Sequence, residues 1–351
     1  MRAMRRCPLL ACLAALAAAG RVLAADPLPA YGADGNAITV SGISSGGFMA
    51  VQFHVAHSRT VTGVGVLAGG PYYCAQGSLW TGFYGCTTPS AWAPLPSVEL
   101  LKAEADLLAR ARLIDPTENL ASARAWLFSG GGDRTVAPVV VDAARRFYAL
   151  YRPPPANLVL VANPRAGHGM ITESAGGACD VTAAPFINDC DYDAAGELLK
   201  HLVGPLEPPA AQANGRIVQF DQRAPAGGDA FAISMADSGY AYVPRACEVE
   251  RCRVHVAFHG CRMSVEAIGE RFVREAGYNR WADANRLIVV YPQTIARNGP
   301  GFRGWRWSYV FNPRGCWDWW GYTGPQYHTN AGAQIRAVKA MVDRLAAPRG
   351  R

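Results

Sequence analysis

Residues 38–50 read ITVSGISSGGFMA, and they hold the pattern Gly-x-Ser-x-Gly between two different kinds of segment. The run before the pattern is β-type, and the run after it is typical of a helix. A nucleophilic serine in this pattern needs that order of strand, tight turn and helix. The sequence therefore predicts Ser44 as a nucleophile; the alternative is an ordinary turn rich in glycine and serine.

The neighbours of Ser44 have predicted roles as well. Gly42 and Gly46 flank a turn at which a Cβ on either side is expected to clash with the strand and the helix. At the N-terminus of the following helix, backbone N–H groups and the helix dipole favour negative charge. The N–H of Ser45 follows the nucleophile in the chain, so it is the expected first oxyanion donor.

A serine nucleophile needs a base, and His168 is the candidate. It lies in AGHGM, residues 166–170, after the apolar run 157–162. The flanking glycines are expected to let its ring swing towards the serine. Other histidines fall on predicted helices, inside a strand or before the last helix, where surface or packing roles are expected: His54, His57, His201, His255 and His328.

The carboxylate that orients this base is expected between the serine and the histidine in the chain, in another loop that follows a strand. Asp133 meets that need, because it follows the β-type run 125–129 and a stretch of glycines. Its alternative role is to stabilise a glycine-rich turn. Asp142 and Asp180 are weaker candidates for the acid.

The loop for a second oxyanion donor is missing before Ser44, because too few residues precede it to form the strands required. A suitable loop occurs much later, where AFHGC, residues 257–261, ends a β-type run. We expect the N–H of Cys261 to be the second donor and His259 to shape the loop. The alternative is a turn that only carries a disulfide. This order of parts predicts a circularly permuted α/β-hydrolase fold.

Alternating apolar runs and helical patterns predict a mostly parallel sheet with helices on both faces. The strands are expected at 37–40, 63–68, 125–129, 157–162, 216–220, 239–244, 253–258 and 287–291. The helices are expected at 46–57, 139–151, 192–202, 265–284 and 331–345. The Pro/Ala-rich stretch 204–215 is interpreted as a loop joining two halves of one sheet, so residues 25–351 are expected to form a single catalytic domain.

Residues 1–24 have a basic start, a short apolar stretch and a small-residue cleavage site, which is the pattern of a secretory signal peptide. Its removal takes away four arginines and lowers the formal net charge from +7 to +3. The remaining chain has no basic cluster with interleaved aromatic residues, which argues against a nucleic-acid partner. We expect a secreted or periplasmic monomer without a membrane anchor. Lipidation at Cys12 is the weaker alternative.

Eight cysteines follow the signal peptide, and an even count in an exported chain favours disulfides over a metal site. No Cys-x-x-Cys pair favours zinc, so no metal is expected. Their connectivity is not fixed by sequence. Proximity suggests three local pairs and one long-range pair: Cys74 with Cys86, Cys179 with Cys190, Cys247 with Cys252, and Cys261 with Cys316.

Tryptophan and tyrosine crowd the region from 305 to 322. Aromatic clusters are usually core. The mixture of tryptophan, glycine and aspartate here lacks the period of a helix or strand, so we interpret it as a loop. If Cys316 pairs with Cys261, this loop is tied beside the oxyanion hole. The substrate-binding candidates on it are Trp307, Trp317, Trp319, Trp320 and Tyr322.

Five motifs taken in order resemble the type 2 catalytic domain of secreted or periplasmic poly(3-hydroxybutyrate) depolymerases. They are GISSGG at 42–47, the Asp133 loop, AGHGM at 166–170, AFHGC at 257–261 and GCWDWWGYTG at 315–324. The resemblance covers nearly the whole chain after the signal peptide. It implies the same triad and the same two oxyanion donors, together with a polyester in an apolar cleft. Many extracellular members carry a further polymer-binding domain, which is not expected here.

The expected reaction is hydrolysis of 3-hydroxybutyrate polymer or oligomers through an acyl-enzyme, without a metal or cofactor. A different exported esterase, acting on feruloyl or acetyl groups or on short lipids, is the alternative within enzymes. A non-catalytic protein that binds polymer surfaces is the alternative from another class.

Overall fold

The computed structural model describes residues 25–303 and 306–350, without the side chains at 301–303 and 306–308. The predicted signal peptide lies outside the described residues. The described chain forms an eight-stranded sheet in the order β4-β3-β2-β1-β10-β11-β9-β8. Its strands are β1 (Ile38–Ile43), β2 (Val61–Leu67), β3 (Arg124–Gly130), β4 (Leu158–Asn163), β8 (Arg216–Asp221), β9 (Ser238–Val243), β10 (Arg253–Phe258) and β11 (Leu287–Tyr291).

The six strands from β4 to β11 in this order run parallel, and β9 and β8 add an antiparallel edge. The central pair joins β1 and β10, which are about two hundred residues apart in the chain, and places Gly42 opposite Phe258. The loops that follow β1 and β10 therefore leave the sheet at one edge. The predicted α/β fold with a mostly parallel sheet is confirmed.

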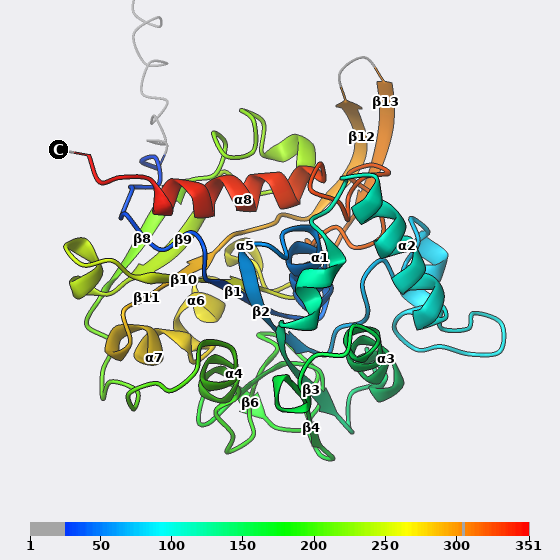
Figure 1. Ribbon diagram of the computed structural model, residues 1–351, viewed down its shortest axis with the longest axis horizontal. Coiled ribbons are helices and arrows are strands. Elements are labelled where there is room, and N and C mark those ends of the chain that lie inside the picture. The colour runs from blue at the N-terminus through cyan, green and yellow to red at the C-terminus, as the bar shows by residue number, and fades with distance from the viewer. Residues whose placement is uncertain (1–24, 304–305, 351) are drawn as a thin grey trace, which may run out of the picture.

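Helices cover both faces of the sheet (Figure 1). Helices α1 (Ser45–Ala56) and α3 (Pro138–Ala149) share one face, where His54 Nδ1 lies 2.8 Å from the hydroxyl of Tyr148. On the other face, Ser41 contacts Tyr278 in α7 (Tyr278–Ala284), and α4 (Ala194–Val203) packs against α7 and β3. Helix α2 (Val98–Arg110) packs outside α3, and α8 (Ala333–Ala346) is the last helix of the described chain.

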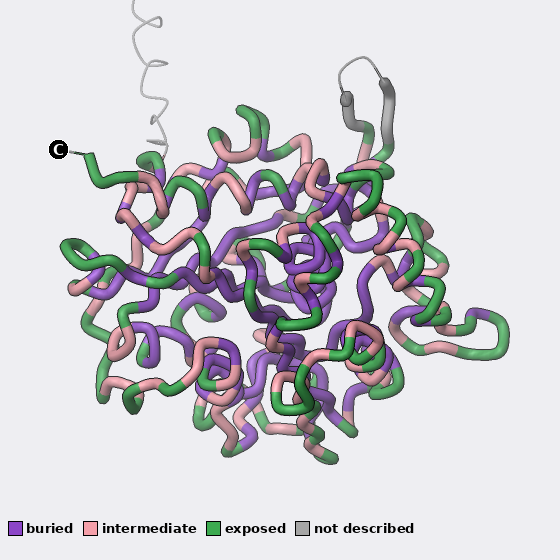
Figure 2. The backbone as a smooth tube through the Cα atoms, in the orientation of Figure 1, coloured by how far each residue is buried: buried purple, intermediate pink, exposed green. Residues whose placement is uncertain are grey.

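Burial explains why these segments form the centre of the fold. Every residue of β1, β11 and α1 is buried, and Figure 2 shows buried segments along the central strands with exposed ones at the periphery. An apolar strand covered on both faces reads as a continuous hydrophobic run, which is typical of a parallel sheet. The residues of β1 therefore hold Ser44 on a rigid base.

All eight predicted strands occur, with ends that differ by at most three residues. The predicted helix 265–284 is wrong: it is broken into α5 (Val265–Ile268), α6 (Arg271–Glu275) and α7. The breaks follow from Gly269 and Gly277, whose φ angles of 64° and 92° leave the helical region.

Several elements were not predicted. Helix α2 is capped by Ser97, whose side chain accepts a hydrogen bond from the N–H of Leu100. The hairpin of β12 (Arg297–Arg303) and β13 (Arg306–Asn312) projects beyond the body of the molecule (Figure 1). A small sheet of β5 (Met170–Thr172), β6 (Gly177–Ala178) and β7 (Ile187–Asp189) follows the His168 loop. Short turns occupy Thr81–Gly85, Thr117–Ala121, Pro155–Asn157, Phe231–Ile233 and Arg245–Glu248.

The segment 204–215 connects α4 to β8. Strands from before and after it belong to the same sheet, with β4 at one edge and β8 at the other. None of the helices in the described ranges is long and apolar enough to cross a membrane.

Candidate active site

Ser44 occupies a sharp turn between β1 and α1. Its backbone has φ 57° and ψ −124°, a conformation that L-residues rarely adopt and that costs roughly 1–3 kcal/mol. Such strain is maintained only where the surrounding structure enforces it, and it is typical of functional sites. The serine is 9% exposed and lines a cleft of about 820 Å³.

The two glycines of the pattern are required by close backbone packing, as the sequence suggested. A Cβ on Gly42 would lie 2.2 Å from the carbonyl oxygen of Gly46. A Cβ on Gly46 would lie 2.3 Å from the carbonyl oxygen of Phe258 and 2.5 Å from that of His259. Gly46 therefore lets the start of α1 approach the end of β10.

His168 and Asp133 are joined by a hydrogen bond of 2.7 Å from Nδ1 to Oδ2. The other carboxylate oxygen, Oδ1, accepts hydrogen bonds from the N–H groups of Thr135 at 2.7 Å and Val136 at 2.9 Å. Both side chains are buried, and His168 also lines the cleft of Ser44. No hydrogen bond links the Ser44 hydroxyl to His168 among the described residues. Such contacts are often long in the free enzyme and tighten when substrate binds.

The expectation that flanking glycines let the His168 ring swing freely is wrong. A Cβ on Gly167 would lie 2.7 Å from the carbonyl oxygen of Asp180, and one on Gly169 would lie 2.6 Å from Asn188 Oδ1. The N–H of His168 also donates to the hydroxyl of Thr182 at 2.9 Å. The glycines admit a tightly packed neighbouring loop, so the histidine is held in place. Asp180, a weaker candidate for the acid, contributes backbone to this packing.

The loop after β10 lies directly beside the serine. A Cβ built on Gly260 would be 3.3 Å from Ser44 Cβ. His259 is fully buried: its Nδ1–H donates to the carbonyl of Gly260 at 2.7 Å, and its Nε2 accepts from the N–H of Thr294 at 3.2 Å. Burial lowers the pKa of His259 to about 4, so the ring is neutral and shapes the loop.

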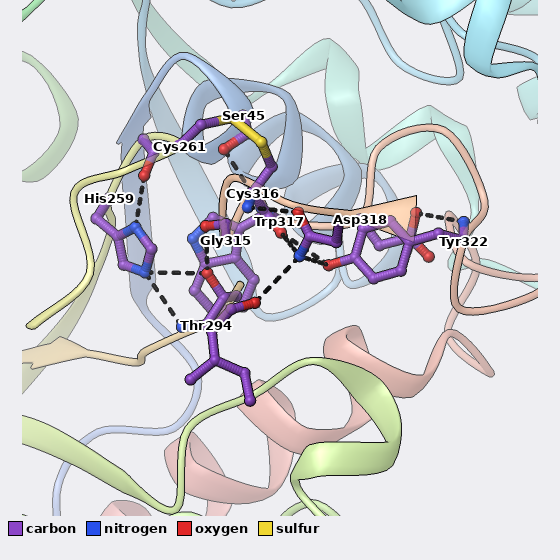
Figure 3. The surroundings of a disulfide bond; sticks show 12 residues. Ser45, His259, Cys261, Thr294, Gly315, Cys316, Trp317, Asp318 and Tyr322 are labelled. Carbon is purple, nitrogen blue, oxygen red and sulfur yellow. Dashed lines mark hydrogen bonds between the residues drawn. A yellow bond between two sulfur atoms is a disulfide. The ribbon is translucent and has the colours of Figure 1, made fainter. Parts of the chain in front are cut away.

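A disulfide between Cys261 and Cys316 ties this loop to the aromatic segment 315–324 (Figure 3). In that segment the N–H of Trp317 donates to the hydroxyl of Ser45 at 3.3 Å. The buried carboxylate of Asp318 accepts three backbone hydrogen bonds, from residues 321, 322 and 323. Burial raises the pKa of Asp318. The oxyanion candidates are therefore fixed by a covalent link and a hydrogen-bonded loop.

The aromatic candidates separate into three groups. Trp319 lines the Ser44 cleft and stacks on Phe48 with ring centroids 4.2 Å apart. Trp317 is 0% exposed and packs against Phe258, so its predicted contact with substrate is wrong; it belongs to the core. Tyr322 is likewise buried, and its hydroxyl donates to the carbonyl of Cys316 at 2.7 Å.

The remaining two tryptophans lie elsewhere. Trp320 borders a neighbouring pocket of about 600 Å³ that shares Phe83 and Arg314 with the Ser44 cleft, so its contact with substrate stays a prediction. Trp307 falls in β13, and its side chain lies outside the described part of the structure.

Several lining residues of the cleft were not predicted. The largest of the apolar ones come from α1, the turn 81–85, the loop before β7, the loop after β10 and α5. They are Phe48, Phe83, Phe186, Met263 and Ile268. None belongs to a motif that carries chemistry, so only their place in the fold identifies them. Together with Trp319 they give the cleft an apolar wall.

A second serine–histidine contact occurs inside the sheet, between the Ser41 hydroxyl and His255 Nε2 at 2.7 Å. His255 Nδ1 lies 2.8 Å from the hydroxyl of Thr39, and Ser41 also contacts the hydroxyl of Tyr278. Ser41 and His255 are 0% exposed, and burial lowers the histidine pKa to about 3. This group is a hydrogen-bonded part of the core that a substrate cannot reach.

One further candidate for the acid, Asp142, is engaged in surface ion pairs. Asp142 lies on α3 and forms ion pairs with Arg145 and Arg146, so it does not serve as the acid that orients His168.

The three remaining disulfides join Cys74 to Cys86, Cys179 to Cys190 and Cys247 to Cys252, the pairs that proximity suggested. Four disulfides indicate folding in an oxidising compartment. Within the described ranges, no group of three or more possible ligands could hold a metal ion.

Comparison with known proteins identifies close relatives. No protein-family model matches the chain. A poly(3-hydroxybutyrate) depolymerase of Delftia acidovorans is 40% identical over 346 residues, which is 96% of this chain and 65% of that protein. A polyhydroxybutyrate depolymerase of Talaromyces funiculosus is 34% identical over 346 residues, covering 96% of both chains.

Solved structures agree with these relatives. The crystal structure of the PHB depolymerase from Penicillium funiculosum matches with a TM-score of 0.81 and 32% identity, over 91% of this chain and 98% of that one. A serine-to-alanine variant of a PHB depolymerase, complexed with an R3HB trimer, matches with the same TM-score and coverage at 33% identity. The resemblance seen in the motifs is confirmed: this chain belongs to the poly(3-hydroxybutyrate) depolymerase family.

Proposed function

We propose that this protein hydrolyses the ester bonds of poly(3-hydroxybutyrate) or its oligomers through an acyl-enzyme on Ser44. The observation that carries the proposal is the hydrogen-bonded pair of His168 and Asp133, which shares one cleft with a serine on a strained turn. Membership of the depolymerase family supports the substrate class. The chain spans 65% of the length of its Delftia relative.

In the proposed first step, the Ser44 hydroxyl attacks the ester carbonyl while His168 Nε2 accepts its proton. Asp133 holds Nδ1–H, which keeps Nε2 free as the base and stabilises the imidazolium that forms. The imidazolium then protonates the leaving alkoxide, and an alcohol departs. Water attacks the acyl-enzyme by the same route in reverse, which releases a carboxylic acid and restores the serine.

The developing oxyanion is proposed to accept hydrogen bonds from the N–H groups of Ser45 and Cys261. The first of these lies at the start of α1, where N–H groups have no partner within the helix. The second lies one residue beyond Gly260, which approaches Ser44 closely. Loss of one such donor costs roughly 100-fold or more in rate in enzymes of this kind.

The cleft suits a short, branched aliphatic ester. Its described lining combines Trp319, Phe48 and Met263 with small polar groups such as Thr135 and Thr182. Apolar side chains favour the methyl and methylene groups of a 3-hydroxybutyrate unit, and the volume of about 820 Å³ accommodates several such units.

The proposal includes a setting for the enzyme. Residues 1–24 are proposed to be an export signal, and residues 25–351 a single catalytic domain that acts as a monomer outside the cytoplasm. The four disulfides support a secreted or periplasmic location. No metal or cofactor takes part in the proposed steps.

The test is clearing of polyester suspensions with identification of the products. We expect amorphous poly(3-hydroxybutyrate) to clear and 3-hydroxybutyrate or its oligomers to appear, with Ser44→Ala inactive. Feruloyl, acetyl and short-lipid esters tested in parallel identify other esterase activities. Faster turnover of one of those esters than of 3-hydroxybutyrate trimer would overturn the proposed substrate. Binding of polymer without any hydrolysis would overturn the enzyme assignment.

A further inference from the structure

The lining of the Ser44 cleft is unusual in its charge. Its described residues include three arginines, Arg134, Arg262 and Arg314, and no aspartate or glutamate. All three are exposed, and none of their guanidinium groups forms a hydrogen bond or ion pair with another described residue. By contrast, Arg271 and Arg274 on the nearby helix α6 both pair with glutamates of the same segment. Among the described residues, these three guanidinium groups therefore have no carboxylate partner, and the cleft presents them to a ligand.

Two of these arginines are built into the loops beside the proposed oxyanion site. The N–H of Arg262 donates to the carbonyl of Arg314 at 2.7 Å, so the two backbones lie side by side. The disulfide of Cys261 and Cys316 fixes the same two loops. Arg262 also has φ 61°, a region that favours glycine. Arg112, Arg152 and Arg286 share this backbone conformation outside the cleft, so the case for Arg262 depends on its place in the cleft lining beside Arg314.

The proposed reaction produces carboxylates, which are anions that these arginines could bind. Hydrolysis of each internal ester leaves one fragment with a new carboxylate and the other with a new hydroxyl. Every oligomer of a 3-hydroxyacid also ends in a carboxylate on the alcohol side of its last ester. Arginine is suited to this ligand, because its planar guanidinium donates two parallel hydrogen bonds to a carboxylate.

We infer that Arg262 and Arg314 bind the terminal carboxylate of 3-hydroxyacid oligomers and so direct the enzyme to esters near that end. This inference rests on the proposed function. The pair acts on binding and leaves the chemical step to Ser44 and His168. It also makes the carboxylate products competitive ligands of the cleft. The enzyme accordingly prefers short acidic oligomers to the same oligomers with a blocked carboxyl end.

The experiment compares 3-hydroxybutyrate trimer as the free acid with its methyl ester, at pH 7.5. For the unaltered enzyme we expect a KM about fivefold or more lower for the acid, and a KM for the acid that rises with added NaCl. The double variant Arg262→Gln, Arg314→Gln should lose this preference, because its KM for the acid should rise about fivefold more than its KM for the methyl ester. The double lysine variant should keep part of the preference, since it retains the charge. Arg336→Gln, an exposed change on α8 outside the cleft, is the control for net charge.

Equal KM values for acid and ester in the unaltered enzyme would overturn the inference. So would an equal loss on both substrates in the double glutamine variant, because the arginines would then only support the loops. If neither trimer is hydrolysed, the proposed function fails instead. In that case the carboxylate site is tested by inhibition of p-nitrophenyl butyrate hydrolysis. 3-Hydroxybutyrate should inhibit this hydrolysis more strongly than its methyl ester does. Equal inhibition by the two compounds would overturn the carboxylate site.

Discussion

His168 Nδ1 lies 2.7 Å from Asp133 Oδ2, while the other oxygen of that carboxylate is occupied by two backbone N–H groups. The carboxylate therefore has a fixed orientation, and it can only act as an acceptor towards the histidine. The proton of the neutral ring is held on Nδ1, which leaves Nε2 as the base.

Asp133→Asn is expected to reduce kcat on the order of 10⁴-fold with little change in fold. The N–H groups of Thr135 and Val136 hold the amide oxygen at the position of Oδ1, so the amide nitrogen faces His168. The histidine must then carry its proton on Nε2 and is not a base. The measurement is kcat on 3-hydroxybutyrate trimer, with Asp142→Asn as the control. Activity of Asp133→Asn within a few-fold of normal would remove Asp133 from the triad.

Gly46→Ala is expected to lower the free energy of unfolding by more than about 2 kcal/mol, because its Cβ would lie 2.3 Å from a rigid backbone carbonyl. The matched control is Gly177→Ala, where a Cβ meets nothing within 4 Å and the change should be within about 0.5 kcal/mol. Urea denaturation measures both. Similar stability of the two variants would show that α1 and β10 can separate easily.

Removal of the disulfide by Cys261→Ser with Cys316→Ser is expected to cost about 4 kcal/mol of stability, since it closes a loop with a sequence separation of 55. The bridge of Cys247 and Cys252, with a separation of 5, should contribute about 2 kcal/mol. Only the first double variant should also lose kcat, because it releases the Cys261 N–H. Full activity and stability of that variant would contradict the proposed oxyanion site.

Acidification should destabilise the protein through its buried and half-buried histidines. Burial lowers their pKa values from 6.5 to about 3 or 4 in the folded state, so the unfolded state binds more protons below pH 6.5. Stability is therefore complete above pH 6.5 and falls as the pH decreases towards 4, by up to about 1.4 kcal/mol per pH unit for each group. The histidines are His54, His57, His255, His259 and His328.

His328→Phe tests one of these groups alone. The ring is stacked on Tyr73 with centroids 4.0 Å apart, and neither ring nitrogen has a hydrogen-bond partner in the described structure. Phenylalanine should keep the stacking, match or raise stability at pH 7, and reduce the loss between pH 6.5 and 4. Urea denaturation at several pH values measures it. An unchanged pH dependence would mean that this histidine titrates normally in the fold.

The strands and the triad candidates could be predicted because their signals are local. Each strand is a short apolar run, and Ser44, Asp133 and His168 each follow such a run in a loop with glycines. The HG loop could be assigned beside them because a parallel sheet brings strand ends to one edge. Its position next to β1 follows from the pairing of Gly42 with Phe258.

The aromatic segment could not be assigned in the same way. Trp317 and Trp319 are two residues apart in one irregular loop, yet one is core and the other lines the cleft. Their difference depends on the disulfide and on the hydrogen bonds of Asp318, which sequence periodicity does not reveal. The break in the predicted helix 265–284 likewise depends on two glycines whose positive φ is a tertiary property.

The identity of the nucleophile is tested most directly by mass spectrometry after reaction with a fluorophosphonate probe. We predict a single adduct on Ser44, absent from Ser44→Ala and retained in Ser45→Ala, with hydrolysis of 3-hydroxybutyrate trimer lost in step with the adduct. Ser41, which is 0% exposed, should remain unlabelled. An adduct on another serine, or trimer hydrolysis that persists in Ser44→Ala, would contradict the assignment of Ser44.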